Sequence, residues 1–555
     1  MRTPKLLIIG WDGATWDLLT PWVHRGELPN LERLMQSGCW GKLASTPLPL
    51  SPAAWSTIVT GQNPGRHGVF DWFERKPDGY GLEYVRTGRI KAKTIWQYFT
   101  EGGRSLGVFC LPMVYPAIPL NGFMISGMAA PNANAQGFSY PPGLLTELED
   151  KLGKYLATEA AIYRYGCEEE FLRSILQWLE YQKKVIFYLL EHYPCDAYLL
   201  VMMQSDHIQH KFWRYLESDF PGFDPDRDSC YQGGILQVYQ ALDSMLGELL
   251  DLFGDQSNFM LLSDHGAGPT YGIMYLNRWL QQVGLLHLRQ GPSTWFKSWA
   301  ARRNLAIQFF RLLARAGLGE LAQLVSKPTR NKALNGYLSF DDVDWVTTNA
   351  YARGAFGQIF VNLIGREPQG SVSPGEDYER VVETILNKLR DLQHLETGRP
   401  LITDLHRREE VLEGTFLEQA ADILFSIQNY EYQSSIKLGF DGEDLLGQSE
   451  YEDSGGHRPE GILVMAGPGI KSGHEIVGAS VTDILPTALA MVDLPIPVNL
   501  DGNPLMQGMM PNLLVTLRYE ESRDWQDRPG TALPDLGPEE VHKIEERLRK
   551  LGYLG

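Results

Sequence analysis

Short apolar runs divide the chain, and most of them end in polar residues able to carry chemistry. The runs occupy residues 5–12 (KLLIIGWD), 105–112 (SLGVFCLP), 196–207 (DAYLLVMMQSDH), 258–266 (NFMLLSDHG), 421–427 (ADILFSI) and 461–469 (GILVMAGPG). They are continuous rather than alternating, which is typical of strands buried on both faces. The pattern therefore predicts a set of central strands.

Helical patterns separate these runs. Residues 28–38 (LPNLERLMQSG) and 236–254 (LQVYQALDSMLGELLDLFG) carry apolar positions at three- and four-residue spacing, and each ends in glycine. Alternation of strands and helices predicts an α/β fold, with a mostly parallel central sheet flanked by helices.

One segment breaks the alternation. Residues 271–344 are largely helical in pattern and locally basic, which predicts an inserted helical lobe covering the site. We expect residues 1–270 and 345–505 to form the catalytic core. Residues 506–555 are polar, contain proline and end in a charged helical pattern, which indicates a tail packed on the surface.

Composition limits the class of protein and of ligand. The 555 residues exceed one typical core, and 43% hydrophobic with 21% charged residues indicates a soluble globular protein. A net charge of −18 without a basic block argues against a nucleic-acid polymer as ligand. A small anionic substrate is compatible with this charge if a metal supplies the positive charge.

The compartment is predicted from the N-terminus and the cysteines. The first residues lack the cleavage site of a signal peptide, and no window is apolar enough for a membrane span. Five scattered cysteines indicate buried thiols in a reducing compartment, so we expect a cytoplasmic protein. The oligomeric state is not indicated.

Acids and histidines gather where the predicted strands end, which is where open α/β sheets place their sites. The set comprises Asp12, Asp206, His210, Asp264, His265 and, in a glycine-rich loop before a strand, His457. Each alone has a simpler explanation as a helix cap or a chance pair. Together they indicate one site, and mixed carboxylates and imidazoles suit zinc, manganese or iron rather than calcium.

The stretch 47–61 (PLPLSPAAWSTIVTG) holds three hydroxyl residues, Ser51, Ser56 and Thr57. Ser51 precedes Pro52, as an N-cap serine precedes a first-turn proline. A helix N-terminus also favours negative charge, so the same position suits a nucleophile. Local sequence leaves both interpretations open.

Several motifs together resemble the alkaline phosphatase superfamily and, within it, the type I phosphodiesterase/nucleotide pyrophosphatase family. They are GWDGA (10–14), LSPAAWSTIVTGQNPGRHGVFDW (50–72), SDHIQH (205–210), SDHGAG (263–268), GGHRPEG (455–461) and the closing segment 481–505. The likeness covers about the first 270 residues and about 400–505.

The resemblance implies a metal-dependent phosphoric ester hydrolase, a phosphodiesterase or nucleotide pyrophosphatase, with Ser51 as nucleophile and a phosphoseryl intermediate. It also implies two divalent metal ions, zinc foremost, with manganese or iron as alternatives. One ion would be held by Asp206, His210 and His457, and the other by Asp12, Asp264, His265 and the Ser51 oxygen. The substrate would be a small anionic phosphoester.

Departures from the family pattern leave the substrate open. Ala54 stands where the nucleotide pyrophosphatases have a phosphoryl-binding asparagine. Candidate replacements are Arg86, Lys91, His207 and Arg458. Alternatives are a phosphomonoesterase, a phosphotransferase like phosphoglycerate mutase, or a metal-stabilised binding module. A sulfatase is disfavoured because no C/S-x-P-x-R pattern surrounds Ser51.

Overall fold

A nine-stranded sheet forms the centre of the protein. The computed structural model describes residues 2–158, 161, 163–254, 256–291, 294, 339–394, 397–435, 444–448, 453–521 and 543–544. The strand order is β20 (His474–Ser480), β2 (Gly38–Ala44), β19 (Glu460–Ala466), β9 (Asn258–Leu262), β1 (Leu6–Trp11), β8 (Ala197–Met202), β5 (Leu106–Leu111), β6 (Gly122–Ser126), β7 (Ser139–Tyr140). Strand β19 is antiparallel to both its neighbours and β7 to β6, while the other pairs are parallel. The predicted mostly parallel sheet is confirmed.

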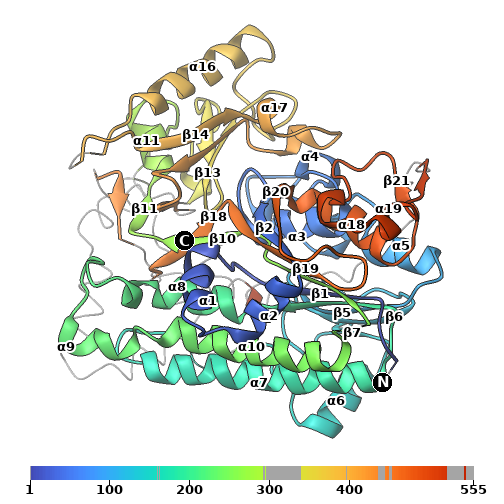
Figure 1. The fold of residues 1–555 in the computed structure, drawn as a ribbon. Helices are drawn as coiled ribbons and strands as arrows, with labels where there is room; N and C mark the ends of the chain where they lie inside the picture. The colour runs from blue at the N-terminus through green and yellow to red at the C-terminus, as the bar shows by residue number, and fades with distance from the viewer. Residues whose placement is uncertain are drawn as a thin grey trace.

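Helices cover both faces of this sheet (Figure 1). Helices α7 (Glu168–His192), α8 (Gln204–Leu216) and α10 (Gly234–Phe253) pack together on one face. Helices α3 (Ser51–Thr60), α18 (Ile484–Met491) and α5 (Ile95–Glu101) lie on the other. The predicted helix at 28–38 is α2 (Pro29–Ser37), and α10 fits the predicted 236–254. Strands buried on both faces explain why the runs are continuously apolar.

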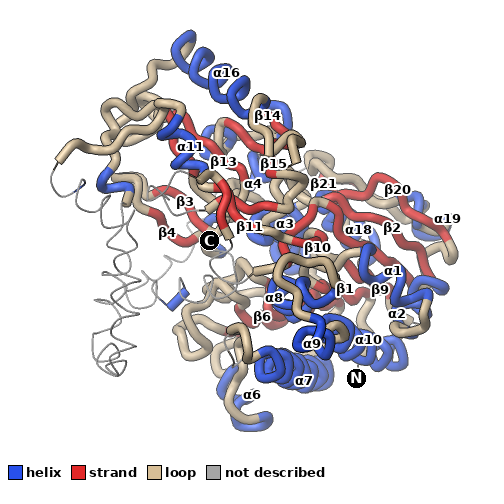
Figure 2. Tube along the Cα trace, turned by 90° about the vertical axis from the view of Figure 1, so that its left-hand side faces the viewer, coloured by secondary structure: helices blue, strands red, loops and turns tan. Residues whose placement is uncertain are grey.

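A second sheet, mostly antiparallel, lies beside the first. Its strands are β12 (Ala350–Ala352), β13 (Gly357–Val361), β15 (Ile423–Ile427), β16 (Tyr432–Ser434), β11 (Gly272–Met274), β17 (Leu446–Gly447), and β14 (Ile402–Arg407) paired with β15. It has its own apolar cluster and carries α11 (Leu276–Gln282) and α16 (Glu376–Arg390). Figure 2 shows this lobe at the upper left and the nine-stranded sheet at the right.

The second sheet changes the place of one predicted strand. The run 421–427 is β15, which is antiparallel to its neighbours in the second sheet rather than part of the parallel one. Its apolar character is the same in both settings because both its faces are covered. Residues 350–447, assigned from sequence to the catalytic core, supply most of this second sheet.

The second lobe leaves and rejoins the core at one place. Strand β10 (Gly266–Pro269) precedes it, β18 (Gly455–Arg458) follows it, and the two pair antiparallel with Ala267 opposite His457. Most of the predicted helical lobe, residues 292–293 and 295–338, lies outside the described residues, as do 522–542 and 545–555 of the predicted tail. The division into domains stays a prediction.

Shorter elements complete the described chain. They are α1 (Trp16–His24), α4 (Pro64–His67), α6 (Leu144–Leu152), α9 (Pro225–Asp228), α17 (Arg408–Val411), α19 (Pro511–Leu514), β3 (Phe73–Arg75), β4 (Leu82–Tyr84), β21 (Ile496–Pro497) and β22 (Tyr519–Glu520). Within the described ranges, no helix combines the length and the apolar character needed to cross a membrane.

The five cysteines are all free thiols, as the sequence predicted. Cys39, Cys110 and Cys195 are buried, whereas Cys167 is half-buried and Cys230 is exposed. The expectation that all five are buried is therefore wrong for two of them. A cytoplasmic location stays a prediction.

Candidate active site

Three adjacent strands deliver the acids of the site. Asp12 follows β1, Asp206 lies in the first turn of α8 after β8, and Asp264 follows β9. Since β9, β1 and β8 are parallel neighbours, their carboxyl ends meet at one edge of the sheet. All three carboxylates are at most 1% exposed. The order of strands thus places three buried acids together.

One group of side chains forms around Asp206. Its Oδ1 atom lies 3.4 Å from His210 Nε2, one helical turn further along α8, and 3.6 Å from His457 Nε2. The two Nε2 atoms are 3.1 Å apart. His457 lies inside the short strand β18, not in the loop that the sequence predicted.

A second group forms around His265. Its Nε2 atom lies 3.3 Å from Asp264 Oδ2, 3.7 Å from Asp12 Oδ1 and 3.2 Å from Ser51 Oγ. The His265 ring stacks on that of His457 with centroids 3.6 Å apart, which joins the two groups. The sets Asp206, His265, His457 and Asp12, Asp264, His265 each have the spacing that could hold a metal ion. His265 is common to both.

The ring nitrogens of the three histidines are oriented alike. Each Nδ1 faces a backbone carbonyl: His210 that of Gly455 at 3.0 Å, His457 that of Pro49 at 2.7 Å, and His265 that of Gly266 at 2.9 Å. A carbonyl only accepts, so each Nδ1–H donates, and the neutral ring turns an Nε2 lone pair into the group. Facing lone pairs repel unless a proton or a cation lies between them.

In the part of the chain that the structure describes, the carboxylates of Asp12 and Asp264 also lack a positively charged partner. Burial, together with Asp264 and Asp206, raises the pKa of Asp12 well above its usual value, and burial raises that of Asp264. Burial alone would raise the pKa of Asp206, but imidazoles that carry a second proton, His210 foremost, attract this carboxylate and lower its pKa well below the usual range. Among the described residues, Asp12 Oδ1 and Asp264 Oδ2 have no hydrogen-bond donor. The donor set fits divalent cations.

Gly13 keeps space beside these oxygens. Its φ is +66°, and a Cβ there would lie 2.9 Å from Asp206 Oδ1. Its amide donates to Asp264 Oδ1 at 3.3 Å, while Gln209 Nε2 donates to its carbonyl at 3.0 Å. The glycine of the GWDGA motif thus provides both the turn and the close approach of the backbone.

Ser51 does not cap its helix. Helix α3 begins at Ser51 itself, and its N-cap, Leu50, makes no side-chain cap bond. The fully buried Ser51 hydroxyl donates instead to His265 Nε2. The N-cap interpretation is wrong, because Pro47–Leu50 already lead into the helix and place Ser51 in its first turn.

Trp55, on the next turn of α3, was not expected at the site. Its indole N–H donates to Asp12 Oδ2 at 2.7 Å. The ring lies against Gly10, where a Cβ would come within 2.4 Å of it. The sequence signal was the tryptophan four residues after Ser51 together with a glycine two residues before Asp12, and only the pairing of α3 with β1 joins them.

Helix α8 packs closely against the chain at the start of β18, next to His210. Ser454 N–H donates to the His210 carbonyl at 2.7 Å, and a Cβ on Gly455 would lie 2.2 Å from the Gln209 carbonyl. Lys211 and Asp453 form a buried ion pair at the same junction. These contacts hold His210 and His457 at a fixed separation, although they come from distant parts of the chain.

The second lobe also contacts the site. Phe356 packs 5.9 Å from the His457 ring and 5.5 Å from Tyr430, whose hydroxyl donates to the Pro47 carbonyl at 3.2 Å. Tyr430 has φ +68°, a conformation that costs a bulky residue of order 1–3 kcal/mol. The turn before β16 is thus held against the loop that leads to Ser51.

Two of the predicted substrate-binding residues are directed elsewhere. The Arg458 guanidinium donates to the carbonyls of Pro269 and Tyr430, tying β18 to β10 and to the second lobe, and burial lowers its pKa to about 10. The His207 ring lies against Trp178 of α7, with centroids 5.1 Å apart, on the side of α8 away from the cluster. These contacts of Arg458 and His207 lie outside the group around His265.

The basic segment 86–93 lies on another part of the surface. Arg86 and Lys91 are half-buried, and the Lys91 side chain lies beside Gly68. Arg89 pairs with Glu74 and Glu83, and Lys93 with Glu101. His67 contacts Thr57 at 2.9 Å, and burial lowers the pKa of His67 to about 3.

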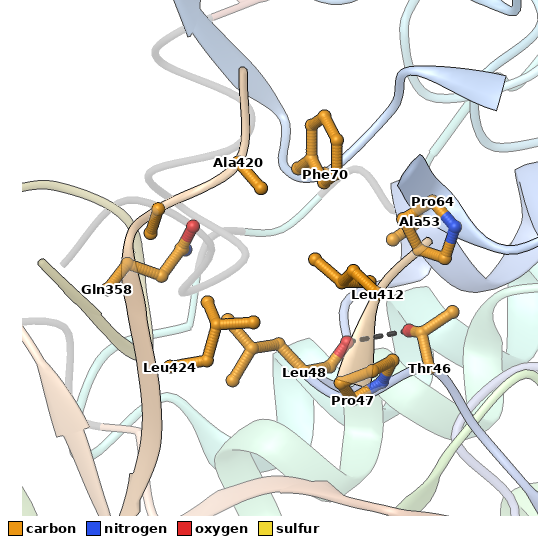
Figure 3. A pocket seen from close by; sticks show the side chains of 11 residues that line it. Thr46, Pro47, Leu48, Ala53, Pro64, Phe70, Gln358, Leu412, Ala420 and Leu424 are labelled. Atoms are coloured by element: carbon orange, nitrogen blue, oxygen red, sulfur yellow. Dashed lines mark hydrogen bonds between the residues drawn. The ribbon is translucent and has the colours of Figure 1, made fainter. Parts of the chain in front are cut away.

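A small apolar cavity lies between α3 and the second lobe (Figure 3). Leu48 and Ala53 face it from the Ser51 side, and Leu424 and Gln358 from the second sheet. Thr46 Oγ1 donates to the Leu48 carbonyl at 2.6 Å along one wall. This seam is where the two lobes meet beside the candidate nucleophile.

Replacing Trp55 tests whether the site depends on its bond to Asp12. Trp55→Phe keeps an aromatic ring but removes the donor to Asp12 Oδ2, so zinc affinity should fall by about 10- to 100-fold. Isothermal titration of zinc into the apo protein measures this. Trp178→Phe is the matched control, because no acceptor for its indole N–H is found among the described residues. Equal affinities for both variants and the native chain would contradict the prediction.

Comparison with solved structures finds similar folds at low sequence identity. Human ectonucleotide pyrophosphatase/phosphodiesterase 5 is 13% identical, with 91% of this chain and 98% of that chain covered and a TM-score of 0.46. The murine enzyme, an inactive variant in complex with AMP, is 13% identical. The match covers 91% of this chain and 100% of that chain, with a TM-score of 0.47. Phosphonoacetate hydrolase from Sinorhizobium meliloti is 14% identical. The match covers 89% of this chain and 96% of that chain, with a TM-score of 0.49.

Comparison with protein families gives a match over most of the chain. No curated protein matches the sequence. Residues 6–437 match the family described as type I phosphodiesterase / nucleotide pyrophosphatase. That range includes every residue of the cluster except His457 and confirms the resemblance found in the motifs. The chain belongs to the type I phosphodiesterase/nucleotide pyrophosphatase family.

Proposed function

We propose that this protein is a metal-dependent phosphodiesterase or nucleotide pyrophosphatase that uses Ser51 as its nucleophile. The observation that carries the proposal is the buried Ser51 hydroxyl, 3.2 Å from His265 in a group of acids and imidazoles that lacks positive charge. Membership of the family supports hydrolysis of phosphoric esters. A hydroxyl beside a group of acids and imidazoles that could bind metal ions supports attack by Ser51 itself.

Two divalent ions would be held by the residues already described. Asp206, His210 and His457 form one set, and Asp12, Asp264, His265 and Ser51 the other. Zinc suits the mixed nitrogen and oxygen donors best, with manganese and iron as alternatives. When bound, such ions supply Lewis acidity for the phosphoryl oxygens and lower the pKa of a bound hydroxyl or water.

The chain itself orients the nucleophile. Ser51 lies in the first turn of α3, where the helix dipole favours negative charge on the oxygen. Its Oγ would form a bond to phosphorus while the bond from phosphorus to the leaving oxygen breaks, giving a phosphoserine. Water would then break the Oγ–P bond and restore the hydroxyl. The buried contacts of His265, Trp55 and Gly13 keep the surrounding groups in place throughout.

The substrate is proposed to be a small anionic phosphodiester or pyrophosphate. Ala54 gives α3 no side-chain donor for the phosphoryl group, so the ester group must be held by other means than in the nucleotide pyrophosphatases.

Ser51→Ala tests the nucleophile. The variant should bind zinc within a few-fold of the native chain but lose turnover by at least 1,000-fold, since no other hydroxyl occupies its place. Ser56→Ala is the control on the same helix: Ser56 is buried, its hydroxyl has no partner among the described residues, and its loss should leave turnover unchanged. Full turnover by the Ser51 variant would contradict the assignment.

Substrate preference tests the reaction class. Zinc-loaded protein should hydrolyse bis-(p-nitrophenyl) phosphate with a higher kcat/KM than p-nitrophenyl phosphate, and should leave p-nitrophenyl sulfate intact. Release of p-nitrophenolate measures all three. Preference for the monoester would favour a phosphatase or mutase instead. Failure to turn over any of them with metal bound would favour the binding-module alternative.

A further inference from the structure

A second cavity lies between the β3–β4 hairpin and the second sheet, outside the candidate active site. Its volume is about 270 Å³, which is room for a small organic ligand. Phe70 and Gln358 line both this cavity and the apolar one of Figure 3. None of the acids and histidines around Ser51 lines it.

Four arginines and five acids line the cavity, and three of the arginines form ion pairs with acids. Arg75 Nε lies 2.9 Å from Glu367, and Arg366 lies 2.6 Å from Asp422. Arg89 pairs with both Glu74 and Glu83. These arginines belong to ion-pair networks that join the hairpin to the second lobe, and they need no further partner.

Arg353, at the tip of the β12–β13 hairpin, is different. Within the described part of the chain it makes no ion pair, and its buried Nη1 has no hydrogen-bond acceptor. Its guanidinium lies over the Phe360 ring, 4.1 Å from the centroid. Asp71 also lines the cavity and attracts Arg353 through its charge, but its carboxylate accepts its hydrogen bonds from Gln358 Nε2 at 2.8 Å and from the Trp72 amide at 2.6 Å rather than from Arg353.

The chemistry of Arg353 indicates which kind of ligand would complete its hydrogen bonds. A guanidinium stays charged at every physiological pH and presents a planar set of donors that matches carboxylate or phosphate oxygens. A buried donor without a partner costs free energy, which an anion in the cavity would recover. The rings of Phe70, Phe73, Tyr351 and Phe360 would cover an apolar or cyclic portion beside that anion.

We propose that this cavity is a binding site for a small organic anion, a phosphate or carboxylate attached to a ring, with Arg353 as its anion-binding residue. The site is separate from the candidate active site and its occupation needs no metal. The cavity lies where the two lobes meet. A ligand there would contact the β12–β13 hairpin, whose Phe356 contacts His457.

Phenyl phosphate is a probe of suitable size and charge. The full chain is first treated with EDTA, so that binding cannot depend on cations held near Ser51. Isothermal titration should then give one phenyl phosphate per chain, with phenol binding at least tenfold more weakly because it lacks the anion. Equal binding of phenol, or no binding of phenyl phosphate, would overturn the proposal.

Two substitutions assign the binding to Arg353. Arg353→Met should weaken phenyl phosphate binding at least tenfold, and Arg353→Lys, which keeps the charge and is the milder change for folding, should weaken it several-fold. Arg390→Met, at an exposed position on α16, is the matched control and should leave binding unchanged. Native affinity in either Arg353 variant would overturn the proposal. Since neither metal nor turnover is needed, this outcome is independent of the proposed hydrolase.

Discussion

Burial of like charges at one edge of a sheet is the constraint on which the rest of the structure depends. Adjacent strands β9, β1 and β8 bring Asp264, Asp12 and Asp206 to the same place, almost wholly out of water. Isolated charges in such surroundings are expensive, and imidazole lone pairs facing the same space add to the cost. Cations in this space would turn mutually repelling groups into ligands.

Contacts with the surrounding chain hold the side chains of the site in place. Carbonyls fix the three imidazoles, Trp55 holds one oxygen of Asp12, and the α8–β18 junction with its buried ion pair sets the separation of His210 and His457. The second lobe leaves the core after β10 and rejoins it at β18, so its position acts directly on the strand that carries His457. The position of the second lobe is thereby linked to the position of His457.

The central sheet could be predicted because strands covered on both faces need unbroken apolar runs, and acids following those runs had to meet at one edge. β15 could not be assigned correctly, because a strand buried between β13, β14 and β16 shows the same run whichever sheet contains it. The role of the Ser51 hydroxyl was ambiguous for a different reason. If the helix began one residue later, Ser51 would be its N-cap; because it begins at Ser51, the hydroxyl points into the site instead.

Charged residues were the least predictable, because their direction depends on partners far along the chain. Arg458 neighbours His457 in sequence, yet alternation along β18 sends it to the carbonyls of Pro269 and Tyr430. His207 is next to Asp206, yet the turn of α8 directs it to Trp178. The sequence places Trp55 one helical turn after Ser51, but only the packing of α3 on β1 brings its indole to Asp12. Arg353 carried no local signal, since its surroundings depend on the packing of the second lobe on the core.

The most direct test of the account is the metal content of the protein after loading with zinc and gel filtration, measured by inductively coupled plasma mass spectrometry. The account predicts two zinc ions per native chain, and a loss of bound zinc when Asp12→Asn and Asp206→Asn are introduced together. A native chain that retains no zinc, manganese or iron, or a double variant that retains as much as the native chain, would contradict it.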